Sequence, residues 1–387
     1  MIARWLSISE RRSALLIGAR RAGKTTLLKI RFPDLPYFTL DDYDLLTLAR
    51  KDPKRLVRSI GPKGIIDEVQ RVPDLLIAVK HGIDDGGQVV LMTGSSTLGL
   101  ASRGVETLAG RIDMLECPTL CWGEEMGAPT HESLSMPPSP VQIAEAGRRL
   151  DAALRFGGFP EVVLAGGDSD RADVLRNYKS TYFARDLLLL SNIEQADALV
   201  ALMAYLASAT GSHLEASNAA REAGMSHPTA RKYLNVLLAS RLAFRLLGHQ
   251  YGPAKRFARA AKYYFSDVGI LEALGIQVSD GQRLEAFVVS ELEKRRLLGR
   301  FRCDGLRYYK SAGGAEIDVV IDEPHLTTAI EIKSTRAPSG ADLRGLRGFV
   351  GQEARKPRRG ILLHLGEEAA DVGGISVLPV AHLWRSL

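Results

Sequence analysis

The sequence predicts an α/β protein that begins with a parallel sheet flanked by helices and continues into smaller modules. Three short apolar runs, at residues 14–17, 64–66 and 89–92, each lead into glycine, hydroxyl or acidic residues. Stretches with a helical pattern separate these runs, and strands that alternate with helices favour a parallel sheet. At 387 residues the chain is too long for a single hydrophobic core, so we expect about two to four domains.

The first apolar run leads into a phosphate-binding motif. Residues 18–25 read GARRAGKT, which matches G-x-x-x-x-G-K-[ST] without a departure. In such a loop backbone N–H groups and a helix N-terminus face the phosphates, Lys24 reaches the β- and γ-phosphates, and the Thr25 hydroxyl binds Mg²⁺. The alternative is a glycine-rich turn that happens to carry a lysine. We therefore expect ATP and Mg²⁺ as cofactors, with ATP contacts from Gly18, Ala19, Arg20, Arg21, Ala22, Gly23, Lys24, Thr25 and Thr26.

The second and third apolar runs end in residues suited to phosphate hydrolysis. After a P-loop, the pair Asp67 and Glu68 is the Walker B arrangement, in which Asp67 holds the Mg²⁺ shell and Glu68 polarises water as general base. The alternative is a strand that ends in a surface acidic pair. The hydroxyls of Thr93 and Ser95 are expected between the P-loop and the Walker B strand, where one of them orients the lytic water.

The order of P-loop, Walker B, polar strand end, helix with a terminal arginine, and strand resembles the AAA+ ATPase core. In that family an arginine at the end of this helix reaches the γ-phosphate held by the neighbouring subunit. The resemblance makes Arg111 the candidate arginine finger, with Arg103 in reserve, and implies a ring, usually a homohexamer. The alternative is that Arg111 only caps its helix C-terminus, a favourable place for a cation.

A finer resemblance extends through most of the chain. Six segments are similar to those of bacterial and archaeal ATPases in which an AAA domain precedes a DUF4143 region. They read LIGARRAGKTTLL, IIDEVQRVPDLL, TGSS, LAGR, RFGGFPEVV and NYKSTYFARDLL. The P-loop and DEVQ are specific for nucleotide chemistry, whereas the later segments indicate the family more than the function.

Composition limits the setting and the partners. With 51 basic and 45 acidic residues the net charge is +6, so attraction to polyanions has to come from local basic patches. Cys117, Cys121 and Cys303 cannot make a disulfide framework and lack partners for a zinc site, which favours a reducing cytoplasm. The first residues have no long apolar segment before their charges, and no run of about 18 apolar residues occurs, so we expect neither a signal peptide nor a membrane partner.

The pattern divides the chain into successive parts. Residues 1–123 form the nucleotide-binding core, and residues 124–140, rich in Gly, Pro and Ser, form a linker. Residues 141–195 have a helical pattern interrupted by GGFP and resemble the lid of AAA+ proteins, which can contribute a further arginine from Arg155 or Arg185.

Residues 196–275 have the pattern of a DNA-reading module. Two helical stretches meet at a tight turn, the second begins at His227 behind the N-cap Ser226, and a hairpin with basic residues follows. This resembles a winged helix-turn-helix. DNA contacts are expected from His227, Thr229, Arg231 and Lys232 on the helix and from Lys255, Arg256, Arg259 and Lys262 on the wing. Winged helices also serve as protein-packing modules, so a protein partner stays open.

Residues 276–387 carry a second cluster of charged residues. Strand alternation puts Glu331 and Lys333 on one face, a neighbouring strand bears Asp318, and a preceding helix bears Glu285 and Glu291. Two carboxylates and a lysine form a site able to hold Mg²⁺ beside a scissile phosphate. This resembles the PD-(D/E)XK nuclease fold. Fold does not carry activity, so a module kept for binding or assembly is the alternative.

These features favour a ring-forming AAA+ ATPase that hydrolyses ATP while engaging DNA, such as branched or junction DNA in recombination or repair. Two other functions stay open. One is a switch-type ATPase that binds a protein partner in stress or phage defence. The other is an ATP-gated nuclease. They differ in whether DNA changes ATP turnover and whether DNA is cut.

Overall fold

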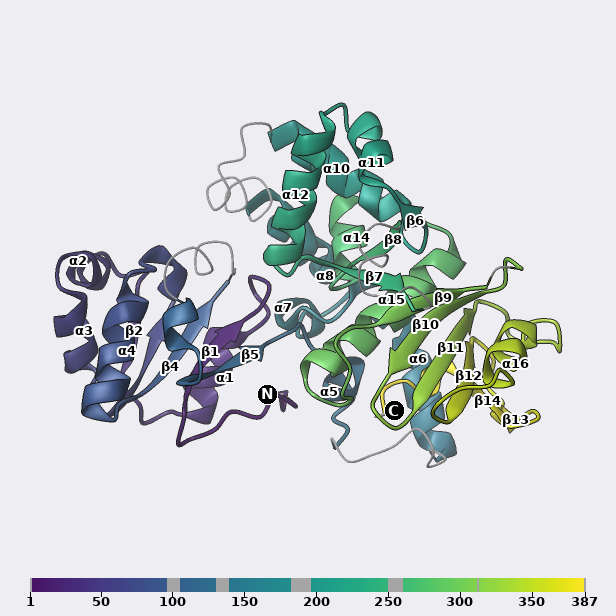
Figure 1. Ribbon diagram of the computed structural model, residues 1–387, viewed down its shortest axis with the longest axis horizontal. Coiled ribbons are helices and arrows are strands. Elements are labelled where there is room, and N and C mark those ends of the chain that lie inside the picture. The colour runs from purple at the N-terminus through teal and green to yellow at the C-terminus, as the bar shows by residue number, and fades with distance from the viewer. Residues whose placement is uncertain are drawn as a thin grey trace.

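The computed structural model describes residues 2–95, 105–129, 139–181, 196–249, 260–311 and 313–385. A parallel sheet lies at one end of the molecule and a larger mixed sheet at the other, with helices between them (Figure 1). Within these described residues, none of the helices combines the length and the apolar character that a membrane crossing requires.

The N-terminal part is a parallel sheet with helices on both faces. Its elements are β1 (Ser13–Ile17), α1 (Lys24–Arg31), β2 (Tyr37–Thr39), α2 (Tyr43–Lys51), α3 (Pro53–Ser59), β3 (Lys63–Asp67), η1 (Val69–Arg71), α4 (Leu75–Gly86), β4 (Val89–Gly94), η2 (Val105–Leu108) and β5 (Ile112–Glu116). The strand order is β2-β3-β4-β1-β5, and every pairing is parallel. Along β1, Leu15 and Ile17 pack into one apolar cluster and Leu16 into another. Burial on both faces explains why β1 is a continuous apolar run, and the predicted α/β fold is confirmed.

Short polar residues fix where the helices of this sheet begin. The Asp42 side chain accepts hydrogen bonds from the backbone N–H groups of Asp44 and Leu45 and so caps α2. Asp52 caps α3 in the same way, and Pro53 occupies its first turn. One of the helical stretches predicted between the apolar runs is therefore two helices divided at Asp52.

A helical region follows β5. It contains α5 (Trp122–Glu125), α6 (Pro140–Phe156), α7 (Pro160–Val163) and α8 (Asp168–Tyr178). Ser139 and Gln142 form a capping box at the start of α6, which ends at Gly157 with a φ of 68°. A Cβ at this position would also collide with a carboxylate oxygen of Asp267. The GGFP interruption is thus a break that the packing requires.

The rest of the chain builds one continuous mixed sheet and its helices. Its elements are α10 (Ala196–Ser208), β6 (His213–Leu214), α11 (Ala216–Glu222), α12 (His227–Ala239), β7 (Ala243–Gly248), β8 (Ala261–Phe265), α14 (Gly269–Leu274), α15 (Asp280–Leu297), β9 (Arg307–Lys310), β10 (Glu316–Asp322), β11 (Thr327–Lys333), α16 (Arg344–Val350), β12 (Arg358–His364), β13 (Ala370–Asp371), β14 (Ile375–Pro379) and η4 (Val380–His382). The strand order is β13-β14-β12-β11-β10-β9-β7-β8-β6. Because β7 pairs in parallel with β9, this sheet crosses the boundary predicted at residue 276.

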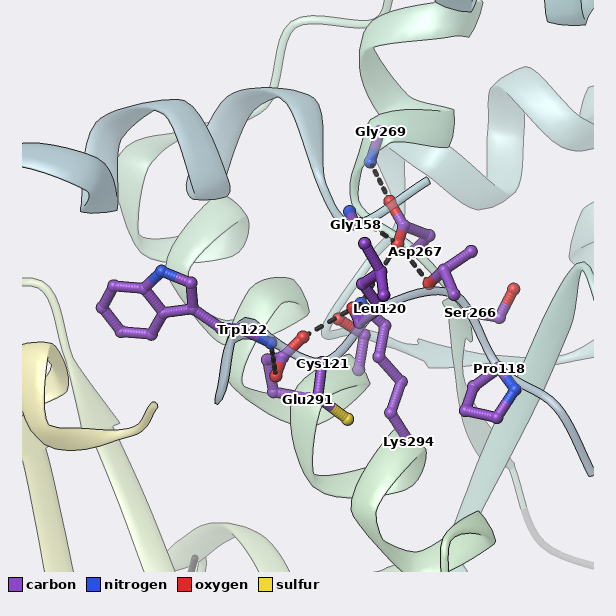
Figure 2. Close-up of polar contacts among 12 residues, drawn as sticks. Pro118, Leu120, Cys121, Trp122, Gly158, Ser266, Asp267, Gly269, Glu291 and Lys294 are labelled. Carbon is purple, nitrogen blue, oxygen red and sulfur yellow. Dashed lines mark hydrogen bonds and ion pairs between the residues drawn. The ribbon is translucent and has the colours of Figure 1, made fainter. Parts of the chain in front are cut away.

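A buried charge cluster joins α15 to the chain that leaves the N-terminal sheet (Figure 2). The Nζ atom of Lys294 lies 3.1 Å from Asp267 Oδ2, 2.9 Å from Glu291 Oε1 and 3.0 Å from the carbonyl oxygen of Leu120. Burial by itself lowers the pKa of Lys294, but the charges of Asp267 and Glu291 outweigh it and hold this pKa above its ordinary value. The lysine is therefore charged in the core.

The two carboxylates of this cluster also accept hydrogen bonds from a side-chain hydroxyl and from backbone N–H groups. Asp267 Oδ2 accepts from the Thr119 hydroxyl at 2.5 Å and from the Gly158 N–H group at 2.9 Å. Glu291 Oε2 accepts from the N–H group of Trp122 at 2.8 Å. Glu291, which lies on the helix predicted to carry an acidic residue of the nuclease-like site, attaches α15 to the segment after β5.

Candidate functional site at the end of the parallel sheet

The loop between β1 and α1 has the backbone shape that a phosphate cradle needs. Gly23 has a φ of 91°, and a Cβ at Gly18 would collide with the carbonyl oxygen of Cys117. Lys24 is buried, and its Nζ donates to the carbonyl oxygens of Gly18 at 2.9 Å and Ala19 at 3.0 Å. Burial lowers the pKa of Lys24. The ammonium group is therefore held against the backbone of the loop itself.

Asp67, at the end of β3, is the centre of the site. Its Oδ1 accepts from the Thr25 hydroxyl at 2.8 Å and from the Thr93 hydroxyl. Its Oδ2 accepts from the Tyr37 hydroxyl at 2.6 Å. Since β4 lies between β1 and β3, the carboxyl ends of these strands meet at one edge of the sheet. Three hydroxyl groups from different segments thus orient one buried carboxylate.

This set of donors fits ATP with Mg²⁺. In P-loop proteins Mg²⁺ takes only one or two protein oxygens and completes its shell with phosphates and water. Thr25 Oγ1 and Asp67 Oδ1 supply two such oxygens 2.8 Å apart. The N-terminus of α1 and the turn at Gly23 direct N–H groups to the same place.

Glu68 adjoins this array and is held by a glutamine. It has a φ of 62°, uncommon for a residue with a side chain, and its N–H group donates to Thr93 Oγ1 at 3.1 Å. Its carboxylate accepts from Gln70 Nε2, which also donates to Ser95 Oγ at 3.0 Å. Burial raises the pKa of Glu68, and the Gln70 hydrogen bond partly offsets this. The predicted base is therefore linked to Thr93 of β4 directly and to Ser95, just after β4, through Gln70.

Sequence reasoning missed Tyr37, Gln70 and Arg4. Tyr37 reaches Asp67 because β2 pairs with β3 in a register that no motif marks. The guanidinium of Arg4 donates to the carbonyl oxygens of Ala22 at 3.0 Å and Pro118 at 2.7 Å. Of these three residues, Gln70 alone had a local signal in the sequence, because it belongs to the DEVQ segment whose acidic residues indicate the Walker B site.

The helical region after β5 also contacts the loop. Glu161 of α7 pairs with Arg21 at 3.1 Å, and the Tyr178 hydroxyl donates to the carbonyl oxygen of Arg20 at 3.4 Å. Arg155, one of the two lid arginines considered, instead pairs with Glu272 of α14 at 3.0 Å. Arg185, the other, lies outside the described residues.

Arg111 lies at the opposite end of the sheet from the P-loop. It precedes β5, whose Ile112 is level with Ser13 at the start of β1, whereas the P-loop follows the end of β1. Strands of this length span roughly 16 Å. The Nε atom of Arg111 pairs with Asp84 Oδ1 of α4 at 2.6 Å, and the turn before it is the 3₁₀ helix η2. The reserve candidate Arg103 is not among the described residues.

Helix α12 carries the DNA-contact residues predicted on it near its N-terminus. His227, Arg231 and Lys232 are exposed. Thr229 is half-buried, and its hydroxyl lies 2.8 Å from that of Ser226, which caps the helix as predicted.

The DNA contacts predicted on the wing are either untested or wrong. Three of the residues lie outside the described part of the chain: Lys255, Arg256 and Arg259. The prediction for Lys262 is wrong, because this lysine is buried and its Nζ pairs with Glu316 at 2.6 Å and with Glu285 at 3.5 Å. A charge paired in the core is not offered to a phosphate.

The residues predicted for a nuclease-like site come together around β10 and β11. Asp318 Oδ2 accepts from the N–H group of Ile332 at 2.8 Å, and Lys333 Nζ lies 2.5 Å from Glu331 Oε1. Burial and the negative charges of Glu331 and Glu285 raise the pKa of Asp318 well above its ordinary value. The negative charges of Glu331 and Glu285 thus disfavour the charged form of Asp318.

Comparisons with known families agree with this architecture. Residues 10–126 match the model of an AAA domain, and residues 147–281 and 280–383 match two domains of unknown function, DUF8612 and DUF4143. Uncharacterized proteins of Mycobacterium bovis and Mycobacterium tuberculosis are each 27% identical over 339 residues, which cover 84% of this chain and 71% of theirs. One of Methanocaldococcus jannaschii is 25% identical over 322 residues, 79% of this chain and 71% of its own.

Two solved structures are also similar to this chain. The Walker-type ATPase of Pyrococcus abyssi has 14% identity and a TM-score of 0.45, covering 68% of this chain and 91% of that one. The Aeropyrum pernix ORC1 protein in complex with DNA has 13% identity and a TM-score of 0.33, covering 69% of this chain and 87% of that one.

The sheet, the phosphate loop and the family match define the class, a P-loop ATPase-like protein with an AAA domain. Within that class, the AAA match over residues 10–126 and the DUF4143 match over residues 280–383 follow one another in the order that the resemblance predicted.

We expect Tyr37→Phe to impair metal use more than nucleotide binding. It removes one of the donors to Asp67, and a hydrogen bond to a charged group contributes about 1.5–3 kcal/mol. The Mg²⁺ concentration for half-maximal ATP hydrolysis should rise roughly tenfold or more, while ATP affinity without metal stays the same. Tyr43→Phe, at an exposed tyrosine of α2, is the matched control. An unchanged Mg²⁺ dependence would contradict the role of Tyr37.

The pH dependence of turnover tests Glu68. A general base acts when deprotonated, and burial raises the pKa of Glu68, so kcat should fall with decreasing pH at values above the ordinary glutamate range. Gln70→Ala removes a hydrogen bond that lowers this pKa, so the acidic limb should move to higher pH. Steady-state ATPase profiles of both proteins give the comparison, with Glu68→Gln as the inactive reference. If the acidic limb of the pH profile stays in place in Gln70→Ala, the Gln70 hydrogen bond has no effect on the pKa of Glu68.

Proposed function

We propose that the chain hydrolyses Mg²⁺-ATP at sites shared between adjoining copies in a ring, usually of six, and that DNA bound at α12 regulates this turnover. The single observation that carries the nucleotide part is the Asp67 carboxylate, held by Thr25, Thr93 and Tyr37 beside the P-loop. The AAA domain match over residues 10–126 supports it.

Each residue of the site has its own role in the proposed reaction. Lys24 exchanges the two carbonyl oxygens of the loop for the β- and γ-phosphates. Thr25 and Asp67 would hold Mg²⁺, and the bound ion would neutralise charge on the phosphates. Glu68 accepts a proton from the attacking water, and Thr93 and Ser95 orient that water.

Arg111 is proposed to act on the ATP of an adjoining copy. It is separated from its own P-loop by the length of β1, so it has no route to its own nucleotide. Its pairing partner Asp84 is on the same exposed surface, and such a pair is weak enough to be exchanged for a phosphate. This position supports a site completed by a second copy.

We expect Arg111→Ala to keep ATP affinity and lose turnover by a factor of roughly 10³ or more, the range known for arginine fingers. The measurement pairs equilibrium ATP binding with steady-state ATPase over a range of protein concentrations. Lys24→Ala should lose both properties, and Arg50→Ala, on the exposed surface of α2, should change neither. Full turnover in Arg111→Ala would exclude the trans-acting role.

The DNA part of the proposal is supported by α12 and its surroundings. The order α10, β6, α11, α12 and the β7–β8 hairpin supports the proposed winged helix-turn-helix, a motif whose second helix enters the major groove. His227, Arg231 and Lys232 are exposed on that helix. Just beyond its end, Arg241 pairs with Glu116 at the end of β5. DNA on α12 is therefore linked by contact to the nucleotide sheet.

We expect DNA to raise ATP turnover of the full-length protein, and the double variant Arg231→Ala/Lys232→Ala to lose most of this increase with basal turnover intact. Each lost phosphate contact should reduce the log-log salt slope of DNA binding by about 1. Arg50→Ala/Lys51→Ala on α2 is the control. Equal turnover with duplex, single-stranded and four-way DNA would contradict the proposal, and stimulation by a co-purified polypeptide would favour the protein-partner alternative.

A further inference from the structure

Lys262 occupies the centre of the C-terminal carboxylate cluster. It lies on β8, is 2% exposed, and its Nζ is 2.6 Å from Glu316 Oε1 and 3.5 Å from Glu285 Oε1. Tyr264 on the same strand donates its hydroxyl to the same oxygen of Glu285 at 2.6 Å. The carboxylate of Glu285 on α15 and that of Glu316 on β10 therefore each already have a donor from β8.

The remaining carboxylates of the cluster are also engaged. Asp318 Oδ2 accepts a hydrogen bond from the N–H group of Ile332, and Glu331 Oε1 forms an ion pair with Lys333 Nζ. Only Glu331 Oε2, among the acidic oxygens of this cluster, is buried without a partner in the described structure. The donors that the chain itself supplies to these carboxylates stand where a divalent ion would need several converging oxygens.

The arrangement therefore does not fit the metal that the nuclease-like resemblance implies. Across the described residues, no group of three or more His, Cys, Asp or Glu side chains is placed to hold a metal ion. A divalent ion between Glu285 and Asp318 would also lie within a few ångströms of the buried Lys262 ammonium group, and like charges repel strongly where water is excluded.

Lys262 comes from a different part of the chain than the carboxylates. Its strand β8 pairs with β6 and β7, and His213 of β6 is its neighbour in register. Gly211, beside β6, has a φ of 78° and lies so close to Glu285 that a Cβ there would be 2.8 Å from Oε2. Glu285 thus packs directly on the module formed by α10 to β8.

We propose that the Lys262 ammonium group is a built-in cation that takes the place of a divalent metal in this cluster and fastens the α10 to β8 module onto α15 and β10. Carboxylates that resemble a metal-binding set are then used for attachment between two parts of the chain. The cluster carries out no metal-dependent phosphodiester cleavage. Buried ion pairs of this kind hold because every charge has a partner.

The test is Mn²⁺ binding to the full-length, nucleotide-free protein, measured by electron paramagnetic resonance. Mn²⁺ takes the same oxygen ligands as Mg²⁺. Wild type and Asp318→Asn should bind the same amount of Mn²⁺, because the cluster holds no metal. Lys262→Met should gain an additional Mn²⁺ ion per chain, and the double variant Lys262→Met/Asp318→Asn should lose it again.

Lys310→Met is the matched control, since Lys310 is an exposed lysine 3.8 Å from the other carboxylate oxygen of Glu316. It should gain no Mn²⁺. The proposal is overturned if wild type binds Mn²⁺ that Asp318→Asn loses, or if folded Lys262→Met, judged by circular dichroism, gains none. Should Lys262→Met fail to fold, the comparison of wild type with Asp318→Asn still decides. None of these measurements depends on ATP hydrolysis.

Discussion

The parallel pairing of β1 with β4, and of β4 with β3, is the constraint on which the nucleotide site depends. Parallel strands end at the same edge of a sheet, so the P-loop, Asp67 and Thr93 meet there although they are far apart along the chain. Strand β4, which lies between β1 and β3, supplies the Thr93 hydroxyl, and β2, on the other side of β3, adds the Tyr37 hydroxyl. One carboxylate is then oriented from three directions before any ligand arrives.

Contacts from outside the sheet hold the same site. Arg4 binds the carbonyl oxygen of Ala22, and Glu161 pairs with Arg21, so the N-terminal segment and α7 both touch the P-loop. The chain that leaves β5 runs past Gly18 and into the Lys294 cluster. Direct contacts therefore connect the loop to α15, and the Glu116–Arg241 pair connects the end of β5 to the end of α12.

Helix α15 illustrates how the C-terminal half manages buried charge. Lys294 neutralises Glu291 and Asp267 on one side, and Lys262 faces Glu285 nearer the start of the helix. Removing one partner of such a pair leaves an uncompensated charge in the core, which costs about 3–5 kcal/mol. Both clusters join segments that are distant in sequence.

The sequence by itself determined the features that reside in contiguous residues. The P-loop, the Asp67–Glu68 pair and the cap at Ser226 could be predicted because their chemistry depends on neighbours along the chain. The structure alone decided the roles of Tyr37, Arg4 and Lys262. A tyrosine on a short strand or a lysine in a basic stretch has no local sign of its partner, since that partner is set by strand register and by packing between remote segments. Burial, which turned Lys262 from a candidate phosphate contact into an internal counter-ion, is a property of the folded chain and not of its local sequence.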